Sequence, residues 1–543
     1  NLQANLSIDA TKYTTINLNL GGWHEKSVYP GVSAGTIMYQ AYRTPPVSAI
    51  YYTNGLWGQY VGHSLIGEAY HSGYNHQPAD QLNTTLSITQ QLPFIEGLSI
   101  QGVVNYDPYR WKKKNYLTPV PVYTLDASKD PYEWTEGYQG PEKPNLSLEY
   151  QERVNTTLQG MINYKNSFGP HNVSALAVVE ARMGSSWNMN AKRNNYGIDI
   201  DEINAGSSDP SDISNGGTSW KERQVGFIFR TAYNYDNRYL AEVSGRYDGH
   251  YYFAPGKRFG FFPAVSLGWN LREEKFMQNI QWIDKLKIRT SYGESGNLAG
   301  SSYQYMSDYG FGTAGNLGGI PVMGMWENLQ GNPNITWEKA KKFDLGVEFS
   351  VLNGMFGLEA DYFYEKRSNM LMAPTALVPA EYGIPLSQVN SGRMHNQGID
   401  LTLSFNKQIN KDWYVGARGT FTYAHNTLDE VFETDVTYNN PNRRRTGRAD
   451  GTMFGYHALG YFTYDDFNPD GSLKAGIPVQ PWGQVYPGDL RYEDLSGPEG
   501  IPDGKIDEHD QTVIGLSNWN PEIIFGFAPS ARWKNFDFDA LFQ

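Results

Sequence analysis

Apolar and polar residues alternate along much of the chain, with a period of two. One face of segment 343–350 carries only apolar side chains: Phe343, Leu345, Val347 and Phe349. The opposite face is polar or small: Asp344, Gly346, Glu348 and Ser350. Successive side chains of a strand point to opposite faces, so this period predicts a strand with one apolar face. Similar alternation is found at 16–20, 225–234, 241–247, 356–364, 399–405, 413–423 and 536–542. The pattern predicts roughly sixteen strands of about 9–11 residues, the length with which a tilted strand crosses a bilayer.

The predicted connections between strands alternate between short and long. Short turns are expected at 9–12, 235–238, 352–355, 406–411 and 533–535. Long loops are expected at 25–79, 107–150, 185–220, 296–335, 372–395 and 427–518. Short turns at one end and long loops at the other are typical of an outer-membrane barrel, and the many Tyr, Trp and Phe residues at strand ends fit two aromatic girdles. We therefore predict an all-β chain, a transmembrane antiparallel β-barrel whose loops are insertions on one rim.

Composition excludes several classes of function. The chain has 543 residues, a formal net charge of −13 and no cysteine. An acidic chain lacks the basic face that phosphate binding needs, which argues against nucleic acid as a partner. Without cysteine there is no disulfide framework, thiol nucleophile or thiolate metal site. The sequence contains no run of about 20 apolar residues, so no transmembrane helix is expected.

Several longer motifs are more specific than the composition. They are YLAEVSGRYDG at 239–249, FAPGKRFGFFPAVSLGW at 253–269, LKIRTSYGESGN at 286–297, NPNITWEK at 332–339, PGDL at 487–490 and DGKID at 503–507. In combination they span most of the chain and closely resemble the SusC/RagA family of TonB-dependent transporters. The family's strand entry "NPxLxWE" and its "PGD…DGxID" loop are similar to the fourth motif and to the last two.

The resemblance implies a barrel of about 22 strands, plugged by an N-terminal domain and capped by a SusD-like surface lipoprotein. TonB would drive import of an oligomeric nutrient across the outer membrane of a Gram-negative bacterium, with a glycan as first candidate and a peptide as second. It implies neither an enzyme nor a required cofactor. Residues 1–3 and 541–543 already read as strand. We therefore expect residues 1–543 to be part of the barrel only, about strands 4–19, without the plug or the last strands.

Two alternatives to this interpretation stay open. A TonB-dependent receptor for a siderophore or cobalamin would share the architecture, although the motifs at 253–269 and 332–339 argue against it. A secreted, soluble β-rich glycan-binding protein or glycosidase would belong to another class. Strands that keep an apolar face throughout the set argue against solubility.

One acidic loop has the order of a calcium-binding loop. Its candidate ligands are Asp494, Ser496, Asp503, the Lys505 carbonyl, Asp507 and Asp510. Gly504 stands at the sharp turn, whereas residues 497–502 are an insertion and the last ligand is Asp instead of a bidentate Glu. Hard oxygen ligands suit Ca²⁺ or another divalent ion. The sequence thus predicts a structural ion in an extracellular loop, and the alternative is an Asp/Gly turn without metal.

Aromatic side chains in the expected loops are candidates for stacking on sugar rings. The substrate-binding candidates are Trp57, Tyr109, Trp111, Trp134, Tyr251, Tyr252 and Trp326, followed by Tyr60, Tyr132, Trp187 and Trp482. For any one of them, packing within a loop or contact with the lipoprotein is the competing interpretation. We expect a few of the set to contact substrate.

Three short motifs are weaker indications of function than the features above. Residues 31–35 match G-x-S-x-G and residues 310–315 match G-x-G-x-x-G, but neither has the strand and helix that a nucleophile elbow or dinucleotide site requires. Both are predicted to be glycine-rich loops. The basic run Arg443–Arg445, with Arg448, could bind an anionic ligand or lipopolysaccharide, although a solvated surface is the favoured interpretation.

Overall fold

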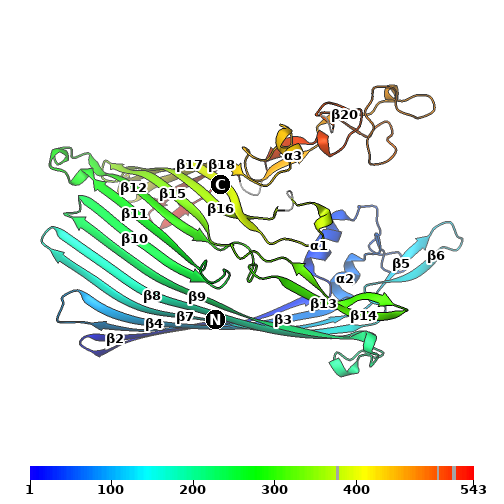
Figure 1. Ribbon diagram of the computed structural model, residues 1–543, viewed down its shortest axis with the longest axis horizontal. Helices are drawn as coiled ribbons and strands as arrows, with labels where there is room; N and C mark the ends of the chain where they lie inside the picture. The colour runs from blue at the N-terminus through cyan, green and yellow to red at the C-terminus, as the bar shows by residue number, and fades with distance from the viewer. Residues whose placement is uncertain (375–377, 498–499, 517–520) are drawn as a thin grey trace. The chain divides into compact units, whose positions relative to one another are not determined.

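Sixteen strands of the described chain form one antiparallel sheet in a computed structural model, which describes residues 1–374, 378–497, 500–516 and 521–543 (Figure 1). The strands are β1 Leu2–Thr11, β2 Thr14–Pro30, β3 Gly73–Gln91, β4 Leu98–Leu117, β7 Asn145–Phe168, β8 His171–Arg193, β9 Ile213–Tyr235, β10 Tyr239–His250, β11 Phe259–Asn270, β12 Ile283–Asn297, β15 Glu338–Val351, β16 Phe356–Met372, β17 Val389–Gln408, β18 Trp413–Glu430, β23 Ile523–Trp533 and β24 Phe536–Asp539. Each pairs with the next in this order. The all-β prediction and its count of about sixteen strands are confirmed.

The chain divides into two compact units. Unit 1 comprises Asn1–Asn163 with Val178–Val225, and unit 2 comprises Tyr164–Ala177 with Gly226–Gln543. In unit 1 the register of β1, β2, β3 and β4 aligns apolar side chains into one row: Leu6, Leu18, Leu86 and Val104. Three of these four are exposed. An exposed apolar row is what a strand wall presents to lipid.

Unit 2 repeats this arrangement over five consecutive strands of the sheet. Opposed positions of β15, β16, β17, β18 and β23 place one apolar row side by side: Leu345, Tyr362, Ile399, Tyr423 and Ile523. The opposite face is charged. Arg289 on β12 contacts Asp344 at 3.3 Å and Asp361 at 2.7 Å. A Cβ on Gly346 would lie 2.1 Å from the Asp361 Oδ1 atom, so glycine leaves the space through which this ion pair crosses β15.

Strands are longer than the sequence predicts, and four of the six long loops are shorter. The strand β7 has 24 residues and β3 has 19, where the expected span was about 9–11. The observed long connections are 31–72, 118–144, 194–212, 298–337, 373–388 and 431–522. Short turns predicted at 352–355 and 533–535 are confirmed. Strand pairing satisfies backbone N–H and C=O groups in water as well as in lipid, so ribbons continue beyond the bilayer.

The long connections contain secondary structure of their own. In unit 1 they hold α1 Ala34–Arg43, α2 Leu65–His71, β5 Val120–Asp126, β6 Glu133–Gln139 and the 3-10 turns 203–205 and 210–212. In unit 2 they hold β13 Asp308–Leu317, β14 Ile320–Leu329, α3 Asp435–Asn439, β19 Thr452–Gly455, β20 Ala458–Tyr461, β21 Leu490–Tyr492, β22 Thr512–Leu516 and the 3-10 turns 380–382, 464–466 and 508–510. Two more 3-10 turns, 271–273 and 275–277, join β11 to β12. None of the helices in the described residues has the length and apolar composition to span a membrane.

Candidate functional sites in the long loops

Two loops of unit 1 form one packed assembly around α2. Ser64 caps this helix by accepting a hydrogen bond from the Gly67 N–H group. Gly67 packs so closely on β5 that a Cβ there would lie 2.2 Å from the Val120 side chain. Backbone hydrogen bonds add to this contact, since Tyr123 N–H donates to the Trp57 carbonyl at 3.1 Å. The loop 31–72 and the β5–β6 hairpin are thereby held together.

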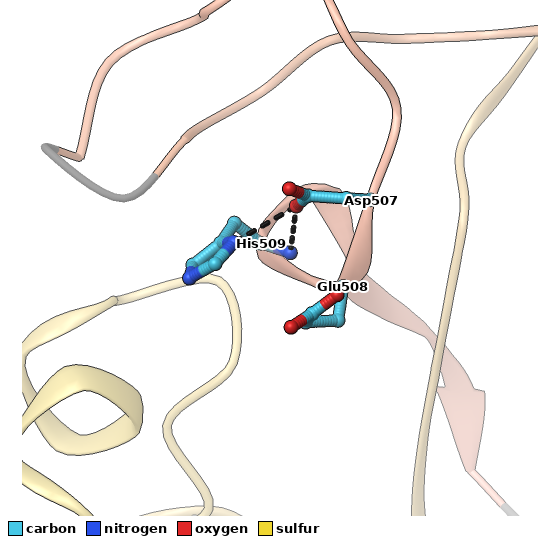
Figure 2. Close-up of side chains that lie close together, drawn as sticks. All are labelled: Asp507, Glu508 and His509. Carbon is cyan, nitrogen blue, oxygen red and sulfur yellow. Dashed lines mark hydrogen bonds and ion pairs between the residues drawn. The ribbon is translucent and has the colours of Figure 1, made fainter. Parts of the chain in front are cut away.

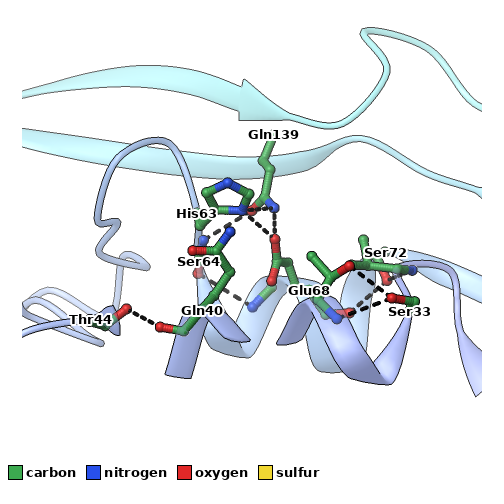
Figure 3. Close-up of polar contacts among 11 residues, drawn as sticks. Ser33, Gln40, Thr44, His63, Ser64, Glu68, Ser72 and Gln139 are labelled. Carbon is green, nitrogen blue, oxygen red and sulfur yellow. Dashed lines mark hydrogen bonds and ion pairs between the residues drawn. The ribbon is translucent and has the colours of Figure 1, made fainter. Parts of the chain in front are cut away.

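A buried carboxylate completes this assembly (Figure 3). The Glu68 side chain is 0% exposed, and its Oε1 atom lies 2.7 Å from His63 Nδ1. The same oxygen accepts a hydrogen bond from the Gln139 amide, and Gln139 Oε1 accepts one from Ser64 N–H at 3.0 Å. Burying a charged group is costly unless it is paired. The pairing of Glu68 therefore depends on the β6 residue Gln139, 71 positions along the chain.

Two predicted substrate residues, Trp57 and Trp134, lie on this assembly. The Trp57 ring lies 4.4 Å from His71, and Trp134 makes an edge contact with Tyr52 at 6.4 Å. Tyr52 in turn donates its hydroxyl proton to the Tyr123 carbonyl. Tyr60 lies under the Arg43 guanidinium, 5.9 Å from the ring centre. Tyr132 lies exposed in the turn of the hairpin. The structure therefore brings Trp57 and Trp134 onto one rigid support.

Other predicted residues lie in strands, and their assignment to loops is wrong. Tyr109 and Trp111 belong to β4, and Trp187 belongs to β8. Tyr109 packs against Trp23 at 6.3 Å, and Trp187 packs against Tyr150 at 5.1 Å. The alternating pattern continues through Trp187, whereas at Tyr109 and Trp111 the apolar residues change to the opposite face of β4. Whether they contact substrate stays a prediction.

In unit 2, two of the sequence motifs meet in a buried aromatic cluster. Phe253 and Phe262 come from the motif at 253–269, and Ile335 and Trp337 come from NPNITWEK. The Trp337 indole N–H donates to the Arg258 carbonyl at 2.9 Å. These motifs therefore fasten the 251–258 turn to the end of the 298–337 loop. The packing of this cluster needs no ligand to explain it.

Tyr251 and Tyr252, both predicted to bind substrate, sit on top of this cluster. Tyr252 packs directly against it, and the two tyrosine rings meet edge to face at 5.0 Å. His250, 7% exposed, lies 4.5 Å from the Tyr252 ring and 4.8 Å from the Tyr251 ring. The structure thus supports both residues on a rigid base.

The other two aromatic candidates of unit 2 lie elsewhere. Trp326 belongs to β14, and its ring covers Gly310 and Gly312 of β13. Residues 310–315 are therefore strand, which corrects the prediction of a loop. Trp482 packs against Tyr456 at 5.0 Å and Tyr492 at 5.4 Å within the 431–522 loop.

The predicted metal ligands mostly accept hydrogen bonds from their own loop. Asp510 is 0% exposed, and it accepts from the N–H groups of Leu495, Ser496 and Asp507. Asp494 accepts from the N–H groups of Asp503 and Gly504. Lys505 pairs its backbone with Val479 in a short parallel bridge. Residues 498 and 499 of the inserted segment lie outside the described residues.

A more compact group of ligating side chains lies within this loop (Figure 2). Asp507, Glu508 and His509 place ligand atoms within 4.8 Å of one another, alone among the residues described. Hydrogen bonds from the His509 N–H and Nδ1 atoms hold the pKa of the Asp507 carboxyl below its usual value. Of the predicted ligands, the group includes only Asp507. Ion binding by this loop stays a prediction.

The motif around Ser33 is followed by a helix, α1, so the expectation of a loop is wrong. The Ser33 side chain caps that helix by accepting from the Thr36 N–H group at 3.1 Å. The basic run also has structural contacts. The Arg444 guanidinium lies 4.2 Å from the Tyr438 ring centre, and Arg448 donates to the carbonyls of Pro441 and Arg444. Both motifs therefore stabilise loops.

A pocket of about 540 Å³ with both polar and apolar lining residues lies in unit 2. Glu242, Lys287 and Arg289 are among its lining residues. Arg230 pairs with Glu242 at 2.6 Å, and Lys287 lies 3.4 Å from Glu348. Neither this pocket nor the Glu68 network was found from sequence. Both depend on register between strands or on loops far apart in the chain.

A wall of long antiparallel strands with an exposed apolar face and long, structured connections defines an outer-membrane barrel protein. Residues 11–526 match the family described as TonB dependent receptor-like, beta-barrel, and the chain belongs to that family. This membership places the protein in the outer membrane of a Gram-negative bacterium and rules out the secreted soluble alternative. It is a family of receptors and transporters, not of enzymes.

Similar proteins are consistent with the family. TonB-dependent receptor P3 of Formosa agariphila is 24% identical over 99% of this chain and 52% of its own length. TonB-dependent receptor SusC of Bacteroides thetaiotaomicron is 24% identical over 58% of this chain and 30% of its own length. A structure of the RagAB peptide importer superposes with a TM-score of 0.76 and 19% identity, covering 99% of this chain and 57% of that one. The chain thus spans about half the length of P3.

Proposed function

We propose that this chain is the barrel region of an importer of oligomeric nutrients, with a glycan as first candidate substrate and a peptide as second. The observation that carries the proposal is the anchoring of aromatic side chains on ordered long loops. Trp57 and Trp134 rest on the Glu68 assembly, and Tyr251 and Tyr252 rest on the Trp337 cluster. Binding sites need side chains held in place by a supporting layer. Loops serving only to connect strands would not need such anchors.

The proposal includes a SusD-like lipoprotein that covers the loops. The β13–β14 hairpin supports this part, because residues 309–326 contain no charged side chain. Phe311 is 75% exposed, and Leu317 and Met323 are similarly exposed. An exposed apolar surface of this kind marks a protein or membrane contact. TonB would supply the energy through a part of the protein other than the barrel wall.

A deletion strain tests the proposal directly. We expect it to lose growth on one oligosaccharide or peptide of a broad panel and to regain it with the full-length gene. Purification of the tagged full-length protein should recover a surface lipoprotein, and replacing Phe311, Leu317 and Met323 by Ser should reduce that recovery. Loss of growth only under iron or cobalamin limitation would establish the siderophore or cobalamin alternative instead. Unchanged growth on every member of the panel would disprove nutrient import.

A further inference from the structure

A series of aromatic rings continues outward from Tyr251 to a residue that sequence reasoning did not select. Tyr251 meets Tyr303 edge to face at 5.6 Å, and Tyr303 lies 6.2 Å from Tyr305. Inward, His250 lies 6.3 Å from Trp337 of the buried cluster. The rings therefore form a continuous row from the core to the surface. Tyr303 is its most exposed member, with 51% of its surface accessible.

The backbone of Tyr303 is strained. Its φ is +63°, in the left-handed region that disfavours residues with a side chain. Glycine would occupy this position without strain, as Gly300 does nearby with a φ of +78°. Strain of this kind persists only where the surroundings enforce it, and it is concentrated at binding and catalytic sites. Tyr303 therefore makes the folded protein less stable than a glycine at this position would.

The loop that carries Tyr303 is fixed on its far side. The Gln304 carbonyl accepts hydrogen bonds from Asn332 N–H and from the Ser387 hydroxyl, both at 2.9 Å. Ser307 accepts a hydrogen bond from Gly331 N–H at 3.2 Å. The strained conformation is thus imposed by two neighbouring segments. The Tyr303 ring is presented on a rigid loop.

Two cationic side chains in the segments that carry the row, Arg246 and Arg258, have partners. Arg246 forms an ion pair with Asp248 at 2.9 Å, and the Arg258 guanidinium donates to the Phe253 carbonyl. What the row offers a ligand is then aromatic surface bordered by tyrosine hydroxyl groups. Rings with an apolar body and a polar edge suit a ligand with C–H faces and hydroxyl groups. A neutral pyranose has this chemistry, whereas a charged peptide or an acidic glycan would need counter-charges.

We propose that Tyr251 and Tyr303 form a stacking site for one ring of a neutral oligosaccharide. This inference rests on the proposed function, because it specifies where the imported substrate binds. The backbone strain at Tyr303 is retained because the ring is needed there. Its replacement by glycine relieves the strain and removes the ring in one step.

The test uses the full-length protein in its own outer membrane. A panel of neutral oligosaccharides, acidic oligosaccharides and peptides first shows which substrate needs the protein. On a neutral oligosaccharide, Tyr303→Gly should weaken binding to the purified protein by about tenfold or more, the loss typical of removing one aromatic contact. Tyr303→Phe should retain binding because the stacking face remains. Tyr464→Gly, which removes an exposed tyrosine from the 431–522 loop, is the control.

The outcomes separate this inference from the proposed function. Tyr303→Gly should fold at least as well as the natural protein, as measured by heat-modifiable migration and protease resistance. Unchanged binding in that variant would overturn the stacking site and leave import intact. Dependence on peptides or acidic glycans alone would also overturn it. If growth on no member of the panel required the protein, the proposed function itself would be disproved.

Discussion

One long-loop assembly in each unit is held together by a different physical means. In unit 1, α2 and β6 meet through a fully buried carboxylate, Glu68, and its partners His63 and Gln139. In unit 2, the 251–258 turn and the 298–337 loop meet through aromatic packing around Trp337. Polar networks require every partner, since an unpaired buried group costs more than a good pair contributes. Apolar clusters lose stability in proportion to the volume removed. The polar anchor should therefore fail when any one partner is lost, whereas the aromatic anchor should lose stability in proportion to the volume removed.

The aromatic anchor gives the largest expected effect. Trp337→Ala removes a side chain that is 4% exposed, together with its hydrogen bond to Arg258. A truncation of this kind costs about 3–5 kcal/mol. We expect hydrogen exchange to become fast in both 250–262 and 330–337, because the cluster joins them. Trp326→Ala, on the exposed hairpin, is the control and should leave both segments protected. Equal effects of the two variants would show that the cluster is not the anchor.

The polar anchor should respond in a non-additive way. Gln139→Leu removes a donor to Glu68 and an acceptor for Ser64 N–H. Leaving such groups unsatisfied costs about 1–3 kcal/mol. The double variant Glu68→Leu/Gln139→Leu removes both partners. It should therefore be more stable than Gln139→Leu alone. A double-mutant cycle, read from hydrogen exchange in α2, measures the coupling. Losses that simply add would mean that the two side chains act independently and that the network is not a unit.

The sheet was predictable from sequence because alternation is local. Phe343–Ser350 and its neighbours carry the period that the strands require, and the shortest turns follow from it. The loop boundaries were not predictable, because β4 continues through Tyr109 and Trp111, where the apolar residues change face. Tyr251 and Tyr252 could be selected because they are aromatic residues in a connection between predicted strands.

The role of Glu68 could not be predicted in the same way. Its burial depends on Gln139, 71 residues away, and nothing in the local sequence LIGEAYH distinguishes it from an exposed helical glutamate. Tyr303 was missed for a similar reason, since its left-handed backbone is imposed by bonds to residues 332 and 387. Long-range partners of this kind carry no local signal.

Lowering the pH should weaken the 194–212 loop of unit 1 through Asp201. In unit 1 the hydrogen bond from Lys114, followed by that from Tyr74, holds the pKa of Asp201 below its usual value. A lowered pKa contributes stability that is complete above the unfolded pKa, about 3.9, and is lost as the pH falls through the folded pKa. We therefore expect residues 194–212 to lose hydrogen-exchange protection below about pH 4. The effect is modest because Asp201 is partly exposed.

A variant checks the origin of this pH dependence. Asp201→Asn should make protection of 194–212 independent of pH, at the lower level that the natural protein reaches in acid. Acid-dependent loss of protection in 194–212 that persists in Asp201→Asn would show that another group carries the pH dependence.

The smallest expected effect concerns Ca²⁺ in the 494–510 loop of unit 2, which would give that unit a polar anchor as well. Asp494 and Asp510 already accept backbone hydrogen bonds, so an ion would add to a loop that is largely formed. At a free concentration equal to its dissociation constant, Ca²⁺ would stabilise the loop by about 0.4 kcal/mol. We expect millimolar Ca²⁺ to slow proteolysis of this loop by about twofold relative to EDTA, and Asp494→Asn to abolish the difference. Asp470→Asn alters another aspartate turn and should preserve it. Identical proteolysis with Ca²⁺ and with EDTA would show that the loop is an Asp/Gly turn without metal. Unit 2 would then have no ion-dependent anchor in this loop.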